Sequence, residues 1–180
     1  MSRRVFSHTV QDEYYTPSYA VNIIIPYIPS GVKIIWCPFD TESSKYVIEL
    51  RNMGYDVVAT HIDDGYDFLS YEPDFTFDAI ISNPPFSLKS EVLGKCLDYC
   101  KPFALLLPFT MFNSISTVRQ IHNTGIEFLI MDRRISFDGQ RPNFTCWYVC
   151  RGFLDKKIET YLFNDDPRKI WLEERLTKQL

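Results

Sequence analysis

The stretch Phe77-Asp78-Ala79-Ile80-Ile81-Ser82-Asn83-Pro84-Pro85-Phe86 carries the strongest structural signal in the sequence. Its apolar run, Ala79 to Ile81, is short and rich in β-branched residues, which is typical of a buried parallel strand. The two prolines end that strand, because proline lacks the N–H group that a sheet ladder requires. Asn83 is pushed toward extended or turn geometry by the proline that follows it. The pattern therefore predicts a rigid turn at the carboxyl end of a strand, which is where open α/β sheets bind ligands.

The groups on this turn suit a planar amine. An exocyclic amine presents two N–H donors, which the side-chain oxygen of Asn83 and the carbonyl oxygen of Pro84 would accept together. These acceptors would hold the nitrogen lone pair toward an electrophile, so that catalysis rests on positioning and electrostatics without a nucleophilic side chain. Pro85 stiffens the turn, and Phe86 offers a face on which the ring that carries the amine can stack. The plain alternative is a stiff turn with Phe86 in the core.

The composition fits one globular domain over residues 1–180. A hydrophobic content of 46% is typical of a packed protein rather than a disordered one. The net charge of −4 argues against a domain that grips nucleic acid through bulk positive charge, although a local basic face is compatible with it. No apolar run approaches the ~20 residues of a membrane span, and no secretory signal is evident. We therefore expect a cytoplasmic protein with no membrane partner.

Cysteine usage gives no sign of a metal centre or a disulfide framework. The five cysteines are an odd number, and no two have the Cys-x-x-Cys spacing of common zinc sites. Cys96 and Cys100, like Cys146 and Cys150, are spaced to share one face of an element, as buried core thiols also do. We expect reduced structural cysteines and no metal.

Apolar strands and amphipathic helices alternate along most of the chain. We expect a helix that begins with Thr16 as N-cap and Pro17 in its first turn, strands at 32–36, 56–60, 79–81, 103–107, 126–131 and 143–150, and helices at 41–53, 87–100 and 110–123. This alternation predicts an α/β fold with a mostly parallel, doubly wound sheet. The last two strands should pair antiparallel, because only a loop separates them. Residues 1–10 are expected to be a loose arm, and residues 155–180 a polar extension with a helix from Asp165 to Lys178.

The turn from Asn83 to Phe86 resembles the Asn-Pro-Pro-aromatic motif of the amino-methyltransferases. These enzymes move a methyl group from S-adenosylmethionine to adenine N6 or, in relatives, to other planar amide or amino nitrogens. The resemblance covers roughly residues 12–150 and is to the phage or prophage type of DNA N6-adenine methyltransferase. It implies a Rossmann-like class I methyltransferase fold with an antiparallel late strand, S-adenosylmethionine as cofactor and direct in-line transfer. Asn83 and Pro84 would orient the amine, and asparagine before the prolines favours adenine over cytosine N4 in this family.

The same resemblance implies contacts with the methionine part of the cofactor. Tyr15, Thr16 and Pro17 match a Tyr-x-Thr-Pro-like element that contacts the methionine carboxylate in the family. The next match is the loop Cys37-Pro38-Phe39-Asp40, which stands where the family carries a glycine-rich loop. Glycines are missing from it, and Asp40 occupies the place of a small residue.

The adenosine part of the cofactor has matches further along the chain. Asp63 lies where Rossmann-like folds place an acid on the ribose hydroxyls, and a carboxylate can accept from both. His61 occupies a slot where relatives often carry Asp; it is either a hydrogen-bonding substitute or an ordinary histidine at a strand end. Asp67 and Phe68 resemble a Gly-x-Asp-Phe element, in which Asp accepts from the adenine amino group and Phe packs beside the ring.

A late loop, residues 133–145, resembles the Arg-Ile-x-Phe…Pro-Phe-x-Ser segment of the phage-type enzymes. Phe144 matches an aromatic residue that stacks on the extruded base from the side opposite Phe86, and two such faces would clamp a flipped base. Arg133, Arg134 and Arg141 would hold the flanking phosphates. The alternative is a solvated basic loop with Phe144 in the core.

The resemblance leaves the acceptor open. DNA is the leading acceptor, but the same motif occurs in enzymes that methylate RNA adenine or protein glutamine. A non-catalytic binding protein, with the methyltransferase fold but without cofactor affinity in its glycine-free loop, is the competing class. No separate target-recognition domain is evident, so sequence specificity would be slight or would come from a dimer or a partner protein. The protein would act in the host cytoplasm if it is phage-encoded.

Overall fold

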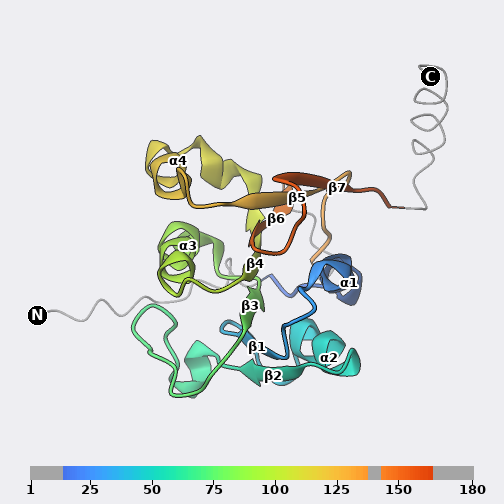
Figure 1. Cartoon of the computed structure of the whole chain (residues 1–180), viewed down its shortest axis with the longest axis vertical. Helices are drawn as coiled ribbons and strands as arrows, with labels where there is room; N and C mark the ends of the chain where they lie inside the picture. Colours follow the sequence, from blue (N-terminus) through green and yellow to red (C-terminus); the bar gives the residue numbers. More distant parts are fainter. Residues whose placement is uncertain (1–13, 138–142, 164–180) are drawn as a thin grey trace, which may run out of the picture.

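A computed structural model describes residues 14–137 and 143–163, which form one sheet with helices on both faces (Figure 1). The strands of this part of the chain are β1 (Ile34–Cys37), β2 (Asp56–Ala59), β3 (Ala79–Ser82), β4 (Phe103–Pro108), β5 (Glu127–Met131), β6 (Cys146–Arg151) and β7 (Ile158–Tyr161). The helices are α1 (Ser18–Ile24), α2 (Lys45–Asn52), α3 (Lys89–Asp98) and α4 (Ile115–Ile121). In Figure 1, α1 and α2 cover one face of the sheet, and α3 and α4 cover the other.

The strand order is β2-β1-β3-β4-β6-β5-β7. The neighbours from β2 to β4 are parallel, as expected where helices connect successive strands. β6 is antiparallel to both β4 and β5, which confirms the predicted antiparallel ending. The predicted α/β fold class is therefore correct.

Burial explains why the central strands are so apolar. Every residue of β3 and β4 is buried, because helices cover both faces of the sheet. Alternate residues point to opposite layers: Ile81 packs with α1 and α2 residues, whereas Ile80 packs with the α3 layer and with Trp36.

Several predicted element boundaries are wrong. Thr16 is not the N-cap of α1: Pro17 holds that position, and the Thr16 side chain makes no capping bond. The predicted helix 110–123 is split, because Ser114 adopts an extended conformation between the 3-10 turn Phe109–Asn113 and α4. Within the predicted polar extension, β7 adds a parallel edge strand beside β5. The predicted arm, 1–10, and the predicted helix, 165–178, lie outside the described residues.

The sheet brings the predicted site residues to one edge. Trp36 of β1 is level with Val58 of β2 and with Ile80 of β3. The three strands are parallel, so the segments that follow them leave the sheet together at their carboxyl ends. No helix within 14–137 or 143–163 is long and apolar enough to cross a membrane.

Candidate active site

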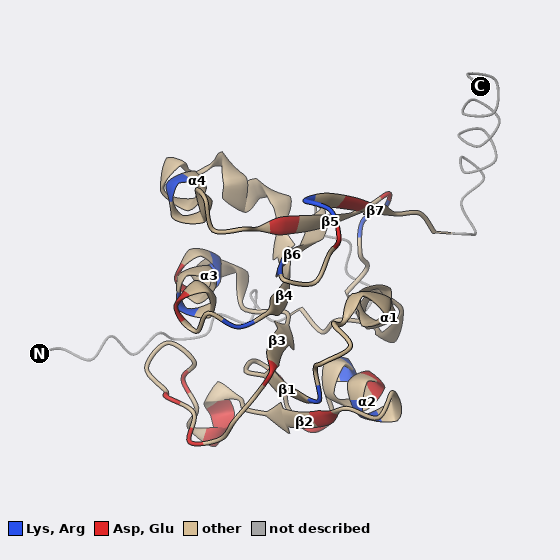
Figure 2. Ribbon diagram, in the orientation of Figure 1, with Lys and Arg blue, Asp and Glu red and all other residues tan. Residues whose placement is uncertain are grey.

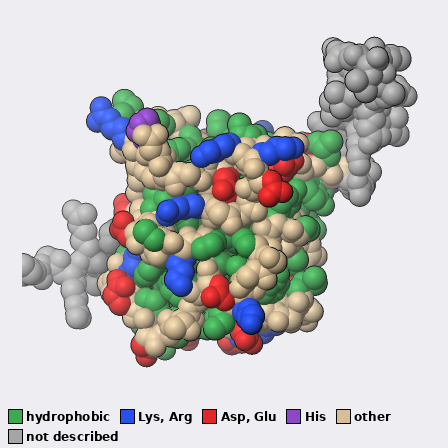
Figure 3. Space-filling model, viewed as in Figure 1, with side chains coloured by type: hydrophobic (Ala, Val, Ile, Leu, Met, Phe, Trp, Pro, Cys, Tyr) green, Lys and Arg blue, Asp and Glu red, His purple; other side chains and the backbone are tan. Residues whose placement is uncertain are grey.

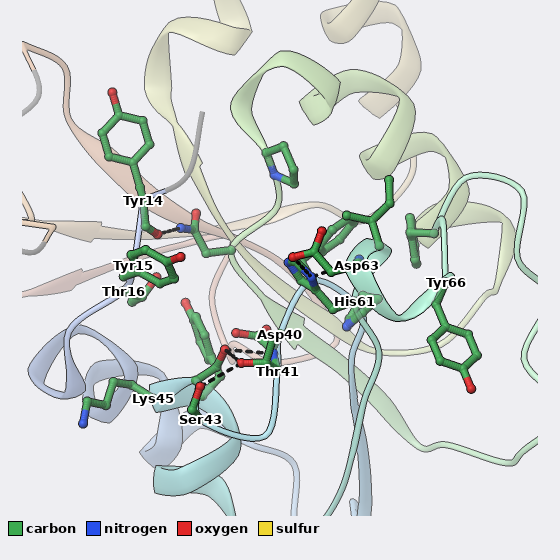
Figure 4. A pocket seen from close by; sticks show the side chains of 18 of the residues that line it. Tyr14, Tyr15, Thr16, Asp40, Thr41, Ser43, Lys45, His61, Asp63 and Tyr66 are labelled. Atoms are coloured by element: carbon green, nitrogen blue, oxygen red, sulfur yellow. Dashed lines mark hydrogen bonds and ion pairs between the residues drawn. The ribbon is translucent and has the colours of Figure 1, made fainter. Parts of the chain in front are cut away.

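A cavity of about 640 Å³ lies at this edge (Figure 4). Its walls come from the segment before α1 and from the segments that follow β1, β2 and β3. The predicted cofactor residues that line it are Tyr15, Thr16, Pro17, Pro38, Phe39, Asp40, His61, Asp63, Asp67 and Phe68. From the Asn-Pro-Pro-Phe turn, Asn83 and Pro85 reach the same cavity. The order of these segments in the sequence therefore translates into one site.

Cys37 is the predicted cofactor residue that does not line the cavity. Its side chain is fully buried in the core beneath the loop. Burial in these apolar surroundings raises the pKa of the Cys37 thiol well above its usual value. Its carbonyl oxygen accepts a backbone bond from Thr60, which ties the β1 loop to the end of β2. The role of Cys37 in the structure is packing.

Asn83 presents an unpaired acceptor at the edge of the cavity. Its Nδ2 donates to the carbonyl oxygen of Tyr14 at 2.9 Å. Its Oδ1 is buried and has no hydrogen-bond partner among the described residues. Because a carbonyl can only accept, the Tyr14 bond fixes Nδ2 as the engaged end of the amide and Oδ1 as the end without a partner. The structure thus leaves the oxygen of Asn83 available to a donor on a ligand.

Aromatic rings gather beside Asn83, but not as a clamp. Phe86 and Phe144 meet edge to face, with centroids 5.4 Å apart and an interplanar angle of 81°. The two faces do not oppose each other in that arrangement, so stacking of a base between Phe86 and Phe144 stays a prediction that requires one of the rings to turn. Instead, Tyr14 stacks on Phe86, with centroids 5.2 Å apart and planes at 25°. The centroid of the Phe137 ring lies 5.3 Å from that of Tyr14. We call these four rings, Tyr14, Phe86, Phe137 and Phe144, the acceptor cluster.

Asp40 is a buried acidic residue in the loop that follows β1. It lines the cavity, yet only 7% of it is exposed. The Ser82 hydroxyl donates to its Oδ2, which links the β1 loop to the residue before Asn83. Burial raises the pKa of Asp40 to about 6, and the hydroxyl donors Ser82 and Ser44 offset that rise only in part.

The predicted ribose end of the cavity lies after β2. His61 Nδ1 accepts from the backbone N–H of Asp63 at 3.3 Å, which caps the 3-10 turn Ile62–Asp64. The carboxylate of Asp63 lies 3.3 Å from the same nitrogen, so a protonated ring would pair with it instead. With 79% of its side chain exposed, Asp63 stands at the rim, where a ligand can reach both oxygens.

The predicted adenine end depends on the turn that follows. Gly65 has a φ of 89°, a left-handed conformation that favours glycine, and it reverses the chain toward Asp67. Asp67 accepts from Leu69 N and from the Ser70 hydroxyl, so its carboxylate is held by its own turn. Phe68 is 3% exposed, and its ring centroid lies 4.9 Å from that of Phe39. Phe68 therefore belongs both to the core and to the cavity wall.

The predicted phosphate contacts do not gather at the cavity. The Arg133 guanidinium lies 3.9 Å above the Phe163 ring, and Arg134 is exposed; neither lines the cavity. Arg141 lies outside the described residues. The segment between β2 and β3 carries Asp and Glu without Lys or Arg (Figure 2). On the face seen in Figure 3, Lys and Arg are scattered among acidic and apolar side chains rather than joined in one surface.

Some residues of the acceptor cluster and of the cavity wall were not predicted from the sequence. Tyr14 and Phe137 belong to the acceptor cluster, and Phe137 is the aromatic residue of the Arg-Ile-x-Phe segment, which was a usable signal. Lys45 and Tyr46, from the start of α2, line the cavity. No cluster of three or more metal-ligating side chains occurs in the part of the chain that the structure describes.

Comparisons with known proteins address the fold. No protein-family model matches the sequence, and no curated protein matches it significantly. The structure resembles a protein described as a class I S-adenosylmethionine-dependent methyltransferase from Listeria monocytogenes, with a TM-score of 0.61 and 13% identity over 94% of this chain and 72% of that one. It also resembles the 23S rRNA methyltransferase ErmE, with a TM-score of 0.52 and 11% identity over 77% of this chain and 69% of that one.

A third similar structure is a type I restriction-modification methyltransferase subunit from Streptococcus thermophilus. Its TM-score is 0.52, with 11% identity over 92% of this chain and 52% of that one. These likenesses agree with the strand order and with the antiparallel ending. The chain therefore has the Rossmann-like fold of the class I S-adenosylmethionine-dependent methyltransferases.

Proposed function

We propose that this protein is an S-adenosylmethionine-dependent amino-methyltransferase whose acceptor is the N6 amine of adenine in nucleic acid, with DNA as the first choice. One observation carries the proposal: Asn83 Oδ1 is buried and unpaired among the described residues, while its Nδ2 is held by Tyr14. An acceptor oxygen fixed in this way, before two prolines at the end of β3, suits an amine with two N–H donors.

The cavity fits the cofactor. The Thr16 hydroxyl is buried without a partner among the described residues, which is the state expected of a donor that a ligand carboxylate would satisfy. Asp63 at the rim offers both carboxylate oxygens to ribose hydroxyls, and the walls around Phe39 and Phe68 are apolar enough for a purine. When bound, S-adenosylmethionine supplies an electrophilic methyl group.

The residues of this chain would act on the acceptor by orientation. Asn83 Oδ1 and the Pro84 carbonyl oxygen would accept hydrogen bonds from the two N–H groups of the amine. These bonds would direct the nitrogen lone pair toward the cofactor side of the cavity. Phe86 supplies a stacking face for the base, once the Tyr14 ring that covers it has moved aside. Phe137 and Phe144 then border the ring at its edges.

The aromatic surroundings favour a nucleobase over a glutamine amide. The Tyr14 ring stacks on Phe86, so the face of Phe86 can hold a planar ring. Stacking of a base on an aromatic side chain is worth about 1–3 kcal/mol per base. The net charge of −4, and the absence of Arg133 and Arg134 from the cavity wall, favour acceptors that need few phosphate contacts, such as an unpaired or flipped base, over a long duplex gripped by its backbone. RNA adenine is therefore the second candidate.

Methyl transfer from labelled cofactor tests the proposal. Purified protein is incubated with unmethylated duplex DNA, single-stranded DNA, RNA and a protein mixture, and N6-methyladenine is sought by mass spectrometry after digestion. Asn83→Ala should lower transfer by about 100- to 1,000-fold, as loss of a well-placed polar group in an active site does. Its affinity for the cofactor should stay within about twofold of wild type, since the amide oxygen faces the acceptor.

The exposed Asn52 supplies a matched control on α2. Asn52→Ala should transfer as well as wild type. Turnover by Asn83→Ala at the wild-type rate would refute the orienting role of Asn83. A folded wild-type protein that binds no cofactor would instead support the competing class, a binding protein with a methyltransferase fold.

A further inference from the structure

Asp40 carries a charge in a buried position. Within residues 14–137 and 143–163 it is the only buried side chain that carries a formal charge. Buried carboxylates are costly unless a cation or several donors compensate them. The oxygen atoms of Asp40 have hydroxyl donors, from Ser82 and Ser44, but no ion pair is found between Asp40 and a described Lys, Arg or His. The structure therefore holds an anionic group in the cavity wall without its counter-charge.

The cationic side chains on the cavity wall do not fill this need. Lys45 lines the cavity, but Figure 4 shows its side chain extending away from Asp40. His61 stands at the end of β2, where its Nδ1 is engaged with Asp63. A positive group on a ligand is what remains to compensate Asp40.

We infer that Asp40 binds the α-ammonium group of the methionine part of S-adenosylmethionine. The inference rests on the proposed function and specifies how a loop without glycines recognises the cofactor. A carboxylate accepts N–H donors of an ammonium group in short, charge-assisted bonds. Here the carboxylate of Asp40 replaces the backbone groups that a glycine-rich loop would offer.

Physical chemistry favours the ammonium over the sulfonium of the same cofactor. A sulfonium has no N–H donor with which to satisfy a carboxylate. The positive charge of the sulfonium also disappears as the methyl group leaves, so a carboxylate held against it would stabilise the ground state more than the transition state. The ammonium keeps its charge throughout the reaction, so binding it costs nothing in the transfer step.

Thr16 completes a site for an α-amino acid. Its hydroxyl is buried, unpaired among the described residues, and lines the same cavity as Asp40. Thr16 lies just before α1 and Asp40 lies in the loop before α2, and these two helices pack against each other on the same face of the sheet. An amino acid group bound here would place its carboxylate at Thr16 and its ammonium at Asp40.

Binding of an ammonium group at Asp40 should depend on pH. The groups that surround Asp40 are Cys37 from β1, Tyr46 from α2, Tyr148 from β6 and the hydroxyls of Ser44 and Ser82. Burial raises the pKa of Cys37, Tyr46 and Tyr148, so these groups stay neutral in mildly acid solution. The pKa of Asp40 is about 6, so affinity for the ammonium should fall as pH drops through that value.

Calorimetric titration of the full chain tests the inference. The ligands are S-adenosylmethionine, S-adenosylhomocysteine and an S-adenosylhomocysteine analogue that lacks the α-amino group. Asp40→Asn should bind the first two about 10- to 100-fold more weakly than wild type, the range expected for charge-assisted bonds. It should bind the analogue as well as wild type does, because each change removes one side of the same contact.

Asp64→Asn is the matched control. Asp64 is exposed, does not line the cavity and loses the same charge, so its variant should titrate like wild type. Should Asp40→Asn fail to fold, the wild-type protein still decides: its affinity for S-adenosylhomocysteine should fall below about pH 6, and its affinity for the analogue should not.

Three outcomes are distinct. Equal weakening of all three ligands in Asp40→Asn, or none, would overturn the inference. Weakening of S-adenosylmethionine alone would place the carboxylate at the sulfonium and would overturn it as well. A wild-type protein that binds no ligand would contradict the proposed function itself, before Asp40 is tested.

Discussion

The two halves of the candidate site meet at Asn83 and differ in what fills them. On one side, the wall of a cavity of about 640 Å³ contains the buried hydroxyl of Thr16, which has no partner among the described residues, and the buried carboxylate of Asp40, which accepts from Ser82 but pairs with no described cation. On the other side, the acceptor cluster is filled by its own rings, with Tyr14 stacked on Phe86. The first half is shaped for a ligand that enters without rearrangement, whereas the second opens only if Tyr14 moves. Cofactor binding should therefore precede acceptor binding and be the less demanding step.

The largest expected effect concerns stability on the cofactor side. The pKa of Asp40 is raised from 3.8 to about 6, so the folded state holds a proton that the unfolded state has lost. The free energy of unfolding should therefore fall as pH rises from about 4 to about 6, by up to about 3 kcal/mol. Asp40→Asn removes the charge but keeps an oxygen that can accept from Ser82. Without ligand, this variant should be more stable than wild type at about pH 7.5, by about 1–3 kcal/mol.

Urea unfolding of both proteins at about pH 5 and about pH 7.5 measures this effect. The advantage of Asp40→Asn should shrink at the lower pH, where wild-type Asp40 is largely protonated. If the variant were less stable than wild type at both pH values, Asp40 would be a satisfied structural acceptor. The contrast between an uncompensated cavity and a closed cluster would then be lost.

A smaller effect is expected on the acceptor side at Phe144. Phe144→Ala removes a ring that borders Phe86, so the KM for the nucleic-acid acceptor should rise by about 10- to 100-fold, as for loss of one stacking contact. The cofactor dissociation constant should not change, because Phe144 does not line the cavity. Steady-state kinetics with each substrate varied in turn separates the two.

Phe112→Ala provides the comparison for Phe144. Phe112 is also a partly buried ring, but it packs in the layer of α3 and α4. Both variants should lose stability, and only Phe144→Ala should lose acceptor affinity. Equal acceptor kinetics in the two variants would return Phe144 to a purely structural role.

The half of the site that sequence predicted well is the half built from local patterns. The strand Ala79–Ser82 and its proline turn are encoded within a few residues, and three of the segments that line the cavity directly follow β1, β2 and β3. The alternation of strands and helices then leaves few possible topologies for the sheet. The predicted cofactor residues therefore line one cavity at this edge of the sheet, except for Cys37.

The acceptor cluster could not be predicted in the same way, because its rings come from distant segments. Tyr14 precedes α1 and lies far from Phe86 in the sequence, and Phe144 precedes β6, so the contacts of both rings with Phe86 depend on tertiary packing. The edge strand β7 was missed for a related reason. Its residues alternate between exposed and partly buried, so the segment is not apolar enough to be recognised as a strand from sequence alone. Its pairing with β5 shows it to be one.

The smallest expected effect belongs to Tyr14, and it has the opposite sign. Tyr14→Ala uncovers Phe86, so the KM for the acceptor should fall by about 2- to 10-fold, the value of one aromatic pair. The turnover number should hold, because the backbone carbonyl that orients Asn83 is still present. Tyr14→Phe keeps the ring and should behave like wild type.

Kinetics with the acceptor varied at saturating cofactor measures both constants. A higher KM in Tyr14→Ala would make the ring a part of the acceptor site rather than its cover. A lower turnover number at unchanged KM would show that the side chain anchors its segment, and through the carbonyl of Tyr14 the amide of Asn83. Only a lower KM with turnover retained means that the acceptor takes the position that Tyr14 occupies on Phe86, and that the closed half of the site opens by exchange of one ring for another.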